Sequence, residues 1–165
     1  MSTAPEGATP GFLVWRLSTK WRVAVDRAVA PLGLTHAQYS LVATLFGMHS
    51  AGLRPSQRQL ADHTGLEALY VSKLARALEA AGLVDRARDP DDPRAVRLSL
   101  STHGHEVARQ ATGVVQQLHE RFLQPLGGVD STRTKNFVRE LHALLDAPLD
   151  PSSTAGPTGT EKEQP

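Results

Sequence analysis

Residues 88–97 place three arginines around a short acidic turn, a pattern suited to contacts with phosphates or with the edges of nucleic-acid bases. Arg88, Arg94 and Arg97 flank or follow the segment D-P-D-D-P, whose Asp and Pro residues are typical of turns. An arginine at the tip of such a turn suits the narrow, electronegative minor groove of DNA. Because a carboxylate and a guanidinium match bidentately, we expect at least one of the acidic residues to form an ion pair that aims Arg94.

A second group of polar side chains lies upstream, on a helix predicted from about Glu67 to Ala81. Its apolar residues recur at helical spacing and predict a buried face: Val71, Leu74, Ala75 and Leu78. Aromatic and hydrogen-bonding side chains project elsewhere: Tyr70, Ser72, Lys73 and Arg76. A helix that reads the DNA major groove needs this division, although any amphipathic surface helix shares it. The helix alone therefore leaves both interpretations open.

Two further candidates, Ser56 and Arg58, lie at the predicted start of the preceding helix. The segment S-Q-R-Q is a capping box, in which the Ser hydroxyl and a Gln side chain satisfy backbone N–H groups, and it predicts a short helix ending near His63. Free N–H groups at a helix start favour anions, so both residues are candidates for holding a phosphate. Gly65 allows the turn into the next helix.

Two strands are predicted on either side of the acidic turn, from Leu83 to Arg88 and from Ala95 to Ser101. Apolar and polar residues alternate in the second strand, which is typical of a half-buried strand. The order helix, turn, helix and hairpin is that of a winged helix-turn-helix. This architecture places one helix in the DNA major groove and a loop near the minor groove, and it predicts double-stranded DNA as a partner.

The rest of the chain is predicted to be helical, so the fold class is mainly α with a small β-hairpin wing. Apolar spacing and capping residues predict four more helices, at Phe12–Ala30, Thr35–Met48, Thr102–Leu123 and Ser131–Leu145. Residues 1–10 and 148–165 are rich in Pro, Gly, Ser and Thr and are predicted to be disordered tails. One domain of about residues 11–147 remains between them.

Composition narrows the class of protein. Hydrophobic residues make up 40% of the 165 residues, which is enough for the core of one domain. There is no cysteine, which excludes disulfides, thiol redox sensing and thiolate metal sites. The sequence shows neither an apolar run of membrane-spanning length nor a secretory signal, so we expect a cytoplasmic protein without a membrane partner. Apart from its acidic C-terminal tail, the chain is mildly basic.

The run from Leu34 to Gly104 resembles the MarR (multiple antibiotic resistance regulator) family of bacterial transcription factors. The matching segments are L-G-L-T-H-A-Q-Y, S-Q-R-Q-L-A-D-H-T-G, Y-V-S-K-L-A-R-A-L-E-A-A-G-L-V-D-R and D-P-D-D-P-R-A-V-R-L-S-L-S-T-H-G. The acidic-x-arginine wing motif, here Asp92-Pro93-Arg94, is the most specific part. The order of helices extends the resemblance over about residues 12–147. It implies a DNA-binding winged helix at about 35–102 and a helical dimerisation lobe formed by about 11–30 and 103–147.

The resemblance implies a transcription regulator, usually a repressor, with Arg94 in the minor groove and Asp92 orienting nearby basic groups. The predicted DNA-binding residues are Ser56, Arg58, Tyr70, Ser72, Lys73, Arg76, Arg88, Asp92, Arg94 and Arg97. Two positions depart from the family pattern. Many relatives have a second arginine where this chain has Ala95, and a small Thr or Ser where it has Tyr70. Both departures affect the expected base readout and leave the expected fold unchanged.

The resemblance also implies a homodimer and a small-molecule ligand. A two-fold dimer predicts a pseudo-palindromic operator with half-sites about 10 bp apart. The predicted lobe helices carry more apolar residues than so small a core needs: Phe12, Leu13, Trp15, Phe122, Leu123, Phe137, Leu141, Leu144 and Leu145. A small aromatic or phenolic ligand is implied for a cleft between the lobes, with ordinary packing as the alternative role of its candidate residues. These are Trp15, Trp21, His36, Tyr39 and Met48.

Other functions find less support in the sequence, and no metal or cofactor is expected. His103 and His105 lie two apart at a helix start, which is poor chelating geometry, and Tyr39-Ser40 stand where the family's zinc-sensing branch has a His/Glu pair. No Ser/His/Asp order, phosphate loop or paired-carboxylate motif indicates an enzyme. The remaining alternative is a winged-helix module that binds proteins without reading DNA, against which the cationic hairpin tip and the donor-rich helix argue.

Overall fold

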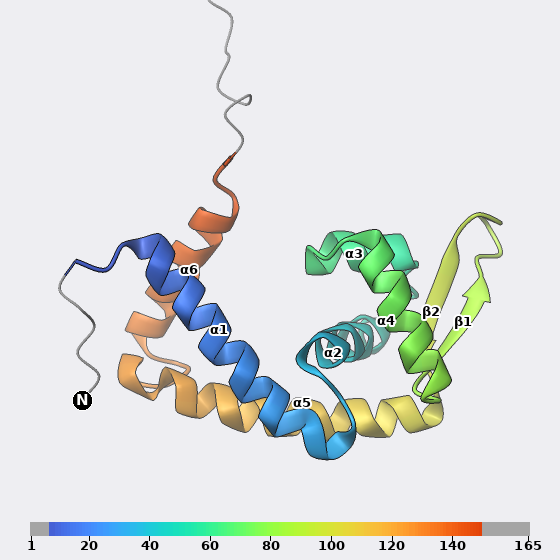
Figure 1. Ribbon diagram of the computed structural model, residues 1–165, viewed down its shortest axis with the longest axis horizontal. Coiled ribbons are helices and arrows are strands. Elements are labelled where there is room, and N and C mark those ends of the chain that lie inside the picture. The colour runs from blue at the N-terminus through green and yellow to red at the C-terminus, as the bar shows by residue number, and fades with distance from the viewer. Residues whose placement is uncertain (1–6, 150–165) are drawn as a thin grey trace, which may run out of the picture. The chain divides into compact units, whose positions relative to one another are not determined.

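The computed structural model describes residues 7–149 and consists of helices with one β-hairpin (Figure 1). The α-helices are α1 Pro10–Val29, α2 His36–Ser50, α3 Gln57–Thr64, α4 Ala68–Ala80, α5 Thr102–Leu123 and α6 Thr132–Leu145. The strands are β1 Val84–Arg88 and β2 Val96–Leu100, and two 3-10 turns, η1 Ala30–Leu32 and η2 Gln124–Leu126, follow α1 and α5. The mainly α fold with a hairpin wing is thereby confirmed. The chain divides between Arg121 and Phe122 into two compact units.

Side-chain caps fix where the helices of the first unit begin. At α3 the Gln59 backbone N–H donates to Ser56 Oγ at 3.2 Å, and the Ser56 N–H donates to Gln59 Oε1 at 2.8 Å. The same reciprocal pair joins Thr35 and Gln38 at the start of α2. Both predicted capping boxes are confirmed, and each satisfies two backbone donors that a helix start leaves unpaired.

The helix-turn-helix consists of α3 and α4, which contact each other and α2. Gly65 makes the turn after α3 at φ 68°, a left-handed conformation that a side chain disfavours. The predicted inner face of α4 is buried, and fully buried leucines from α2, α3, α4 and β2 meet in one core: Leu41, Leu45, Leu60, Leu78 and Leu98. Burial of each such side chain stabilises the fold by about 1.5–3 kcal/mol, so this core holds α4 in place.

The hairpin stands beside α4 and pairs its strands antiparallel (Figure 1). Its register sets Arg88 opposite Val96 and Ala87 opposite Arg97. A short extended segment before α3 also joins the sheet, because Ser56 bridges to Arg97 and the Leu98 N–H donates to the Pro55 carbonyl at 3.1 Å. The sequence did not predict this third strand-like contact, which ties the start of α3 to the hairpin.

The base of the hairpin is fastened to the start of α5 at Ser101 and Gly104. The Ser101 hydroxyl donates to the Gly82 carbonyl at 2.6 Å and accepts from the Gly104 N–H at 2.9 Å. Gly104 lies so close to the chain before β1 that a Cβ atom there would be 1.9 Å from the Leu83 carbonyl oxygen. Only glycine allows this approach of α5 to the hairpin.

Helix α1 begins at Pro10, two residues before the predicted start, because Thr9 caps it by accepting from the Phe12 N–H. Only Val25 and Val29 of α1 are buried, whereas the apolar side chains near its N-terminus are exposed: Phe12, Leu13, Val14 and Trp15. The predicted tails, residues 1–10 and 148–165, lie for the most part outside the described residues.

The second unit contains α6, which Ser131 caps by accepting from the Thr134 N–H at 3.1 Å. Thr134 is buried, and its hydroxyl donates to the Gly128 carbonyl at 2.7 Å. Large apolar side chains on or after α6 are exposed, namely Val138, Leu144, Leu145 and Leu149. The unit therefore presents apolar surface as well as a capped helix.

Candidate nucleic-acid interface

Ion pairs stiffen the tip of the hairpin. Arg97 Nε lies 2.6 Å from Asp89 Oδ2, and Arg97 Nη2 lies 3.1 Å from Asp91 Oδ2. The hydrogen bond from Arg97 lowers the pKa of the Asp89 carboxyl, and the same bond raises the pKa of Arg97. A single guanidinium thus holds two turn carboxylates, each through one charge-assisted hydrogen bond.

Arg94 is aimed by its backbone and not by an ion pair, so the prediction of a carboxylate paired with its side chain is wrong. The Asp92 carboxylate accepts from the Arg94 backbone N–H at 2.9 Å, a local turn that short acidic side chains favour. In the described part of the chain the ion pairs of the turn run to Arg97, because the strand register sets its side chain beside Asp89 and Asp91. The exposed Arg94 side chain is left available for a ligand.

One depression of the surface joins the hairpin tip to the start of α3. Its lining includes four of the predicted DNA-binding residues, Ser56, Arg58, Asp92 and Arg94, together with Gln57, Ala61, Asp62, Leu66, Ala68, Ala95 and Val96. Segments far apart in the sequence therefore bring their polar groups to one place. Arg58, Arg94 and the first N–H groups of α3 offer contacts to a phosphate there, and Asp62 and Asp92 line the same depression.

The outward face of α4 forms a second, shallower depression. Its lining consists of Glu67, Leu69, Tyr70, Lys73 and Arg76, and thus contains three of the predicted residues. Arg76 Nη2 donates weakly to Ser72 Oγ at 3.3 Å, which brings the fourth predicted residue of this helix to the same face. The outward face is rich in donors that suit base edges and phosphates.

Sequence reasoning left Leu69 out of this face, although its side chain is 79% exposed. It lies four residues before Lys73 and seven before Arg76, the spacing that aligns side chains along a helix. That spacing was the signal available in the sequence. Of the other predicted DNA-binding residues, Arg88 is exposed at the end of β1 and lines neither depression.

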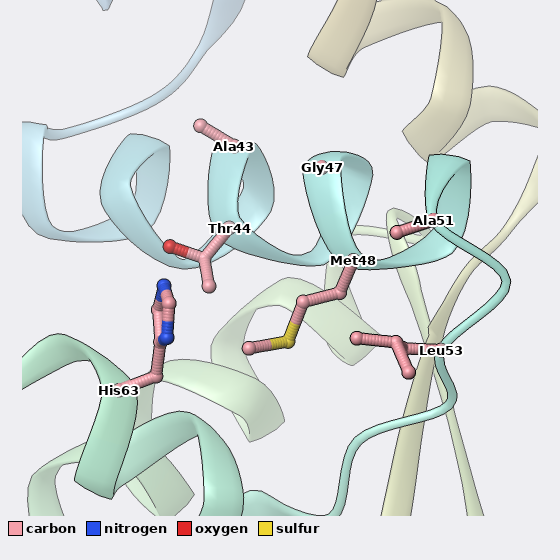
Figure 2. A pocket seen from close by; sticks show the side chains of 7 residues that line it. All are labelled: Ala43, Thr44, Gly47, Met48, Ala51, Leu53 and His63. Carbon is pink, nitrogen blue, oxygen red and sulfur yellow. The ribbon is translucent and has the colours of Figure 1, made fainter.

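The five predicted ligand residues have different surroundings. Met48 lies in an apolar depression beside α2, which Figure 2 shows with Leu53 and His63 pointing into it. The other four predicted residues are absent from its lining, which consists of Ala43, Thr44, Gly47, Met48, Ala51, Leu53 and His63. Trp15 is 62% exposed and stacks on Phe12, 5.9 Å between ring centroids. Trp21 and Tyr39 pack against the core, and the His36 backbone N–H donates to Asp26.

Histidine 105 contacts aromatic side chains of α2. Its ring centroid lies 5.7 Å from that of His49 and 6.0 Å from that of Phe46. Burial lowers the pKa of His49, which favours its neutral form in the fold.

Within residues 7–149, no helix is long and apolar enough to cross a membrane.

Comparison with known proteins decides the family. The sequence profile of the MarR family matches residues 32–95, the span from α2 to the hairpin tip. The chain is 31% identical over 137 residues to the uncharacterized HTH-type transcriptional regulator YdcH of Bacillus subtilis, which covers 83% of this chain and 90% of YdcH. The chain belongs to the MarR family of transcriptional regulators. The HTH-type transcriptional repressor Rv2887 of Mycobacterium tuberculosis is 29% identical, with 82% of this chain and 95% of that protein covered.

Solved MarR-family structures have the same fold. The S. aureus MepR–DNA complex superposes with a TM-score of 0.75 at 21% identity, covering 84% of this chain and 96% of MepR. The structure of the PcaV regulator from Streptomyces coelicolor in complex with its natural ligand superposes with a TM-score of 0.69. The two chains are 23% identical, and the match covers 89% of this chain and 99% of PcaV. At these identities the likeness concerns the fold. The winged helix-turn-helix expected from the sequence is thereby confirmed.

Proposed function

We propose that this MarR-family regulator represses transcription by binding an operator with α4 in the major groove and the hairpin tip in the minor groove. The observation that carries the proposal is the depression in which Arg94 of the hairpin, Arg58 of α3 and the α3 N-cap Ser56 lie together. It lies next to the α4 face that presents Lys73 and Arg76. Specific binding requires two groups of side chains, one that contacts the DNA backbone and one that reads the bases.

We infer that the protein acts as a homodimer. The exposed Phe12, Leu13 and Trp15 on α1 support this inference, because large apolar side chains grouped on one surface favour association. Two-fold symmetry would give two recognition helices on a pseudo-palindromic operator with half-sites about 10 bp apart. Sedimentation velocity on the full chain tests this part, with Trp15→Glu expected to shift dimer to monomer.

We further propose that a small aromatic or phenolic ligand releases the protein from DNA. Support comes from the resemblance of the fold to PcaV, a regulator whose structure holds its natural ligand. Titration of the protein–operator complex with phenolic acids tests the proposal, and release of DNA is the expected result.

Selection of bound sites from random duplex DNA tests DNA binding itself. We expect enrichment of a pseudo-palindrome, and the logarithm of the binding constant should fall linearly with the logarithm of the salt concentration, because phosphate contacts release counterions. An unselective, salt-independent outcome would favour the alternative of a protein-binding winged helix. Arg109→Ala provides a matched control, since this exposed arginine pairs with Glu106 on α5 away from the two depressions.

A further inference from the structure

Leu69 is an apolar side chain in a place where the fold does not need one. It is the second residue of α4, and its side chain is 79% exposed. The buried face of α4 consists of Val71, Leu74, Ala75 and Leu78, on the opposite side of the helix. The packing of this helix therefore gives no reason for a leucine at position 69.

The neighbours of Leu69 are hydrogen-bond donors. Leu69, Lys73 and Arg76 follow one another at i, i+4 and i+7, so they form a single row along the outward face. All three line the same shallow depression, with Tyr70 at its side. If Lys73 and Arg76 reach base edges, Leu69 lies on the same face of the helix that enters the groove.

Charge at the start of α4 also favours bases over the phosphate backbone as the contact of Leu69. Glu67, two residues earlier, occupies the N-cap position without a side-chain capping bond, and its carboxylate lines the same depression. Next to Leu69 this carboxylate would repel a phosphate, and a leucine offers a phosphate no hydrogen bond. Arg58 and Arg94 are the candidates for backbone contacts, in a depression that Asp62 and Asp92 also line.

We propose that Leu69 determines operator specificity by packing against the C5-methyl group of a thymine in the major groove. Thymine is the base that presents a methyl group there, and an apolar side chain recognises it by burying that group. This inference rests on the proposed DNA binding by α4. It adds a base preference, a thymine in each half-site, at the position that faces the start of α4.

The test is a double-substitution cycle between the protein and the DNA. Each thymine of the selected operator is replaced in turn by deoxyuracil, which removes the methyl group and leaves base pairing intact. We expect one thymine per half-site whose replacement weakens wild-type binding by about fourfold, the ratio for burying one methyl-sized group. For Leu69→Ala the same replacement should have no effect, because the methyl group has lost its contact.

A matched control is Leu53→Ala. Leu53 is also largely exposed, at 55%, but lies in the loop after α2 and not on the α4 face. This variant should keep the wild-type sensitivity to deoxyuracil, and thermal unfolding should show both variants folded. Alanine at position 69 suits a helix, so loss of the fold is not expected.

Equal sensitivity of Leu69→Ala and wild type to deoxyuracil at every position would overturn the inference and leave the proposed function intact. The same holds if Leu69→Ala alters self-association in sedimentation velocity without altering the response to deoxyuracil, because Leu69 would then be a protein contact. A wild-type protein that selects no duplex would overturn both the inference and the proposed function.

Discussion

The hairpin tip and the outward face of α4 hold their cationic side chains in opposite ways. At the tip, Arg97 is bound by two carboxylates and the Arg94 backbone by a third, so the turn has a fixed shape. On α4 the helix backbone is fixed by its buried face, while Lys73 and Arg76 extend from it with only a weak bond between Arg76 and Ser72. A fixed turn suits one contact with the DNA backbone that does not depend on sequence, and adaptable side chains on a rigid helix suit base edges.

The largest expected effect is loss of the hairpin's anchor in Gly104→Ala. The added Cβ atom would lie 1.9 Å from the Leu83 carbonyl oxygen, so the hairpin base and α5 must separate. Overpacking of this kind costs about 3 kcal/mol or more, which thermal and urea unfolding will measure.

Gly113→Ala on the same helix is the control for this substitution. No atom from outside α5 lies within 4 Å of the Cβ position there, so the change should be neutral or stabilise α5 by up to about 1 kcal/mol. Equal stability of the two alanine variants would show that the hairpin base is not tightly anchored to α5.

Base-reading contacts of α4 come next. Lys73→Ala and Arg76→Ala should each weaken operator binding by about 1–3 kcal/mol. The loss should be largest for one preferred base and vanish when that base pair is replaced, because a bidentate contact reads a single position. Fluorescence anisotropy with singly substituted operators measures this. A loss that is the same for every operator would assign these residues to the phosphates.

Arg94→Ala should weaken binding by about 1.5 kcal/mol, the lower end of the range for a hydrogen bond to a charged group. The loss should be similar for operator and unrelated duplexes, and the stability of the fold should not change, because Arg94 is exposed at the tip. Titrations at several salt concentrations give a second measurement. If Arg94 contacts a phosphate, the slope of log K against log salt should be smaller by about 1 in the variant. Arg109→Ala should leave both quantities unchanged.

The smallest effect is expected from the brace inside the tip. The brace is the pair of Asp89 and Arg97. Asp89, whose side chain is only 12% exposed, has a pKa below its ordinary value because Arg97 donates a hydrogen bond to its carboxylate. A carboxyl whose pKa is lower in the folded state stabilises the fold above its unfolded pKa, near pH 4, and the contribution is lost as pH falls through the folded value.

The pH dependence of the Arg97 Nε–H signal in NMR measures this brace. The signal should persist between pH 7 and about pH 5, and it should be lost in acid as Asp89 gains a proton. Asp89→Asn should weaken the signal at neutral pH and lower DNA affinity less than Arg94→Ala does. Asp85→Asn, at an exposed position of β1, is the matched control. An unchanged signal in Asp89→Asn would show that Arg97 is not held by this pair.

Local features of the fold were predictable from the sequence. The capping boxes at Ser56 and Thr35 were correct because they involve residues three apart, and Val71 and Leu74 were correctly placed because helical spacing decides which face is buried. The hairpin followed from its alternating strand and its acidic turn. Each of these signals lies within a few residues of the structure that it predicts.

Features that depend on pairing between segments were not predictable. The ion pairs of the turn run to Arg97 because strand register sets its position, whereas the sequence suggested Arg94. The Pro55 contact with β2 and the close approach at Gly104 likewise join distant segments. The ligand residues could not be singled out from the sequence, because Trp21 and Tyr39 share their apolar character with ordinary core residues.

The central claim is that the hairpin tip strengthens binding to any duplex and that α4 selects the sequence. The most direct test is the ratio of affinities for the selected operator and for a scrambled duplex, measured at one salt concentration for wild type, Arg94→Ala and Arg76→Ala. We predict that Arg94→Ala lowers both affinities and nearly preserves the ratio, whereas Arg76→Ala lowers the ratio about tenfold or more. A collapse of the ratio in Arg94→Ala, with the wild-type ratio kept in Arg76→Ala, would contradict the account.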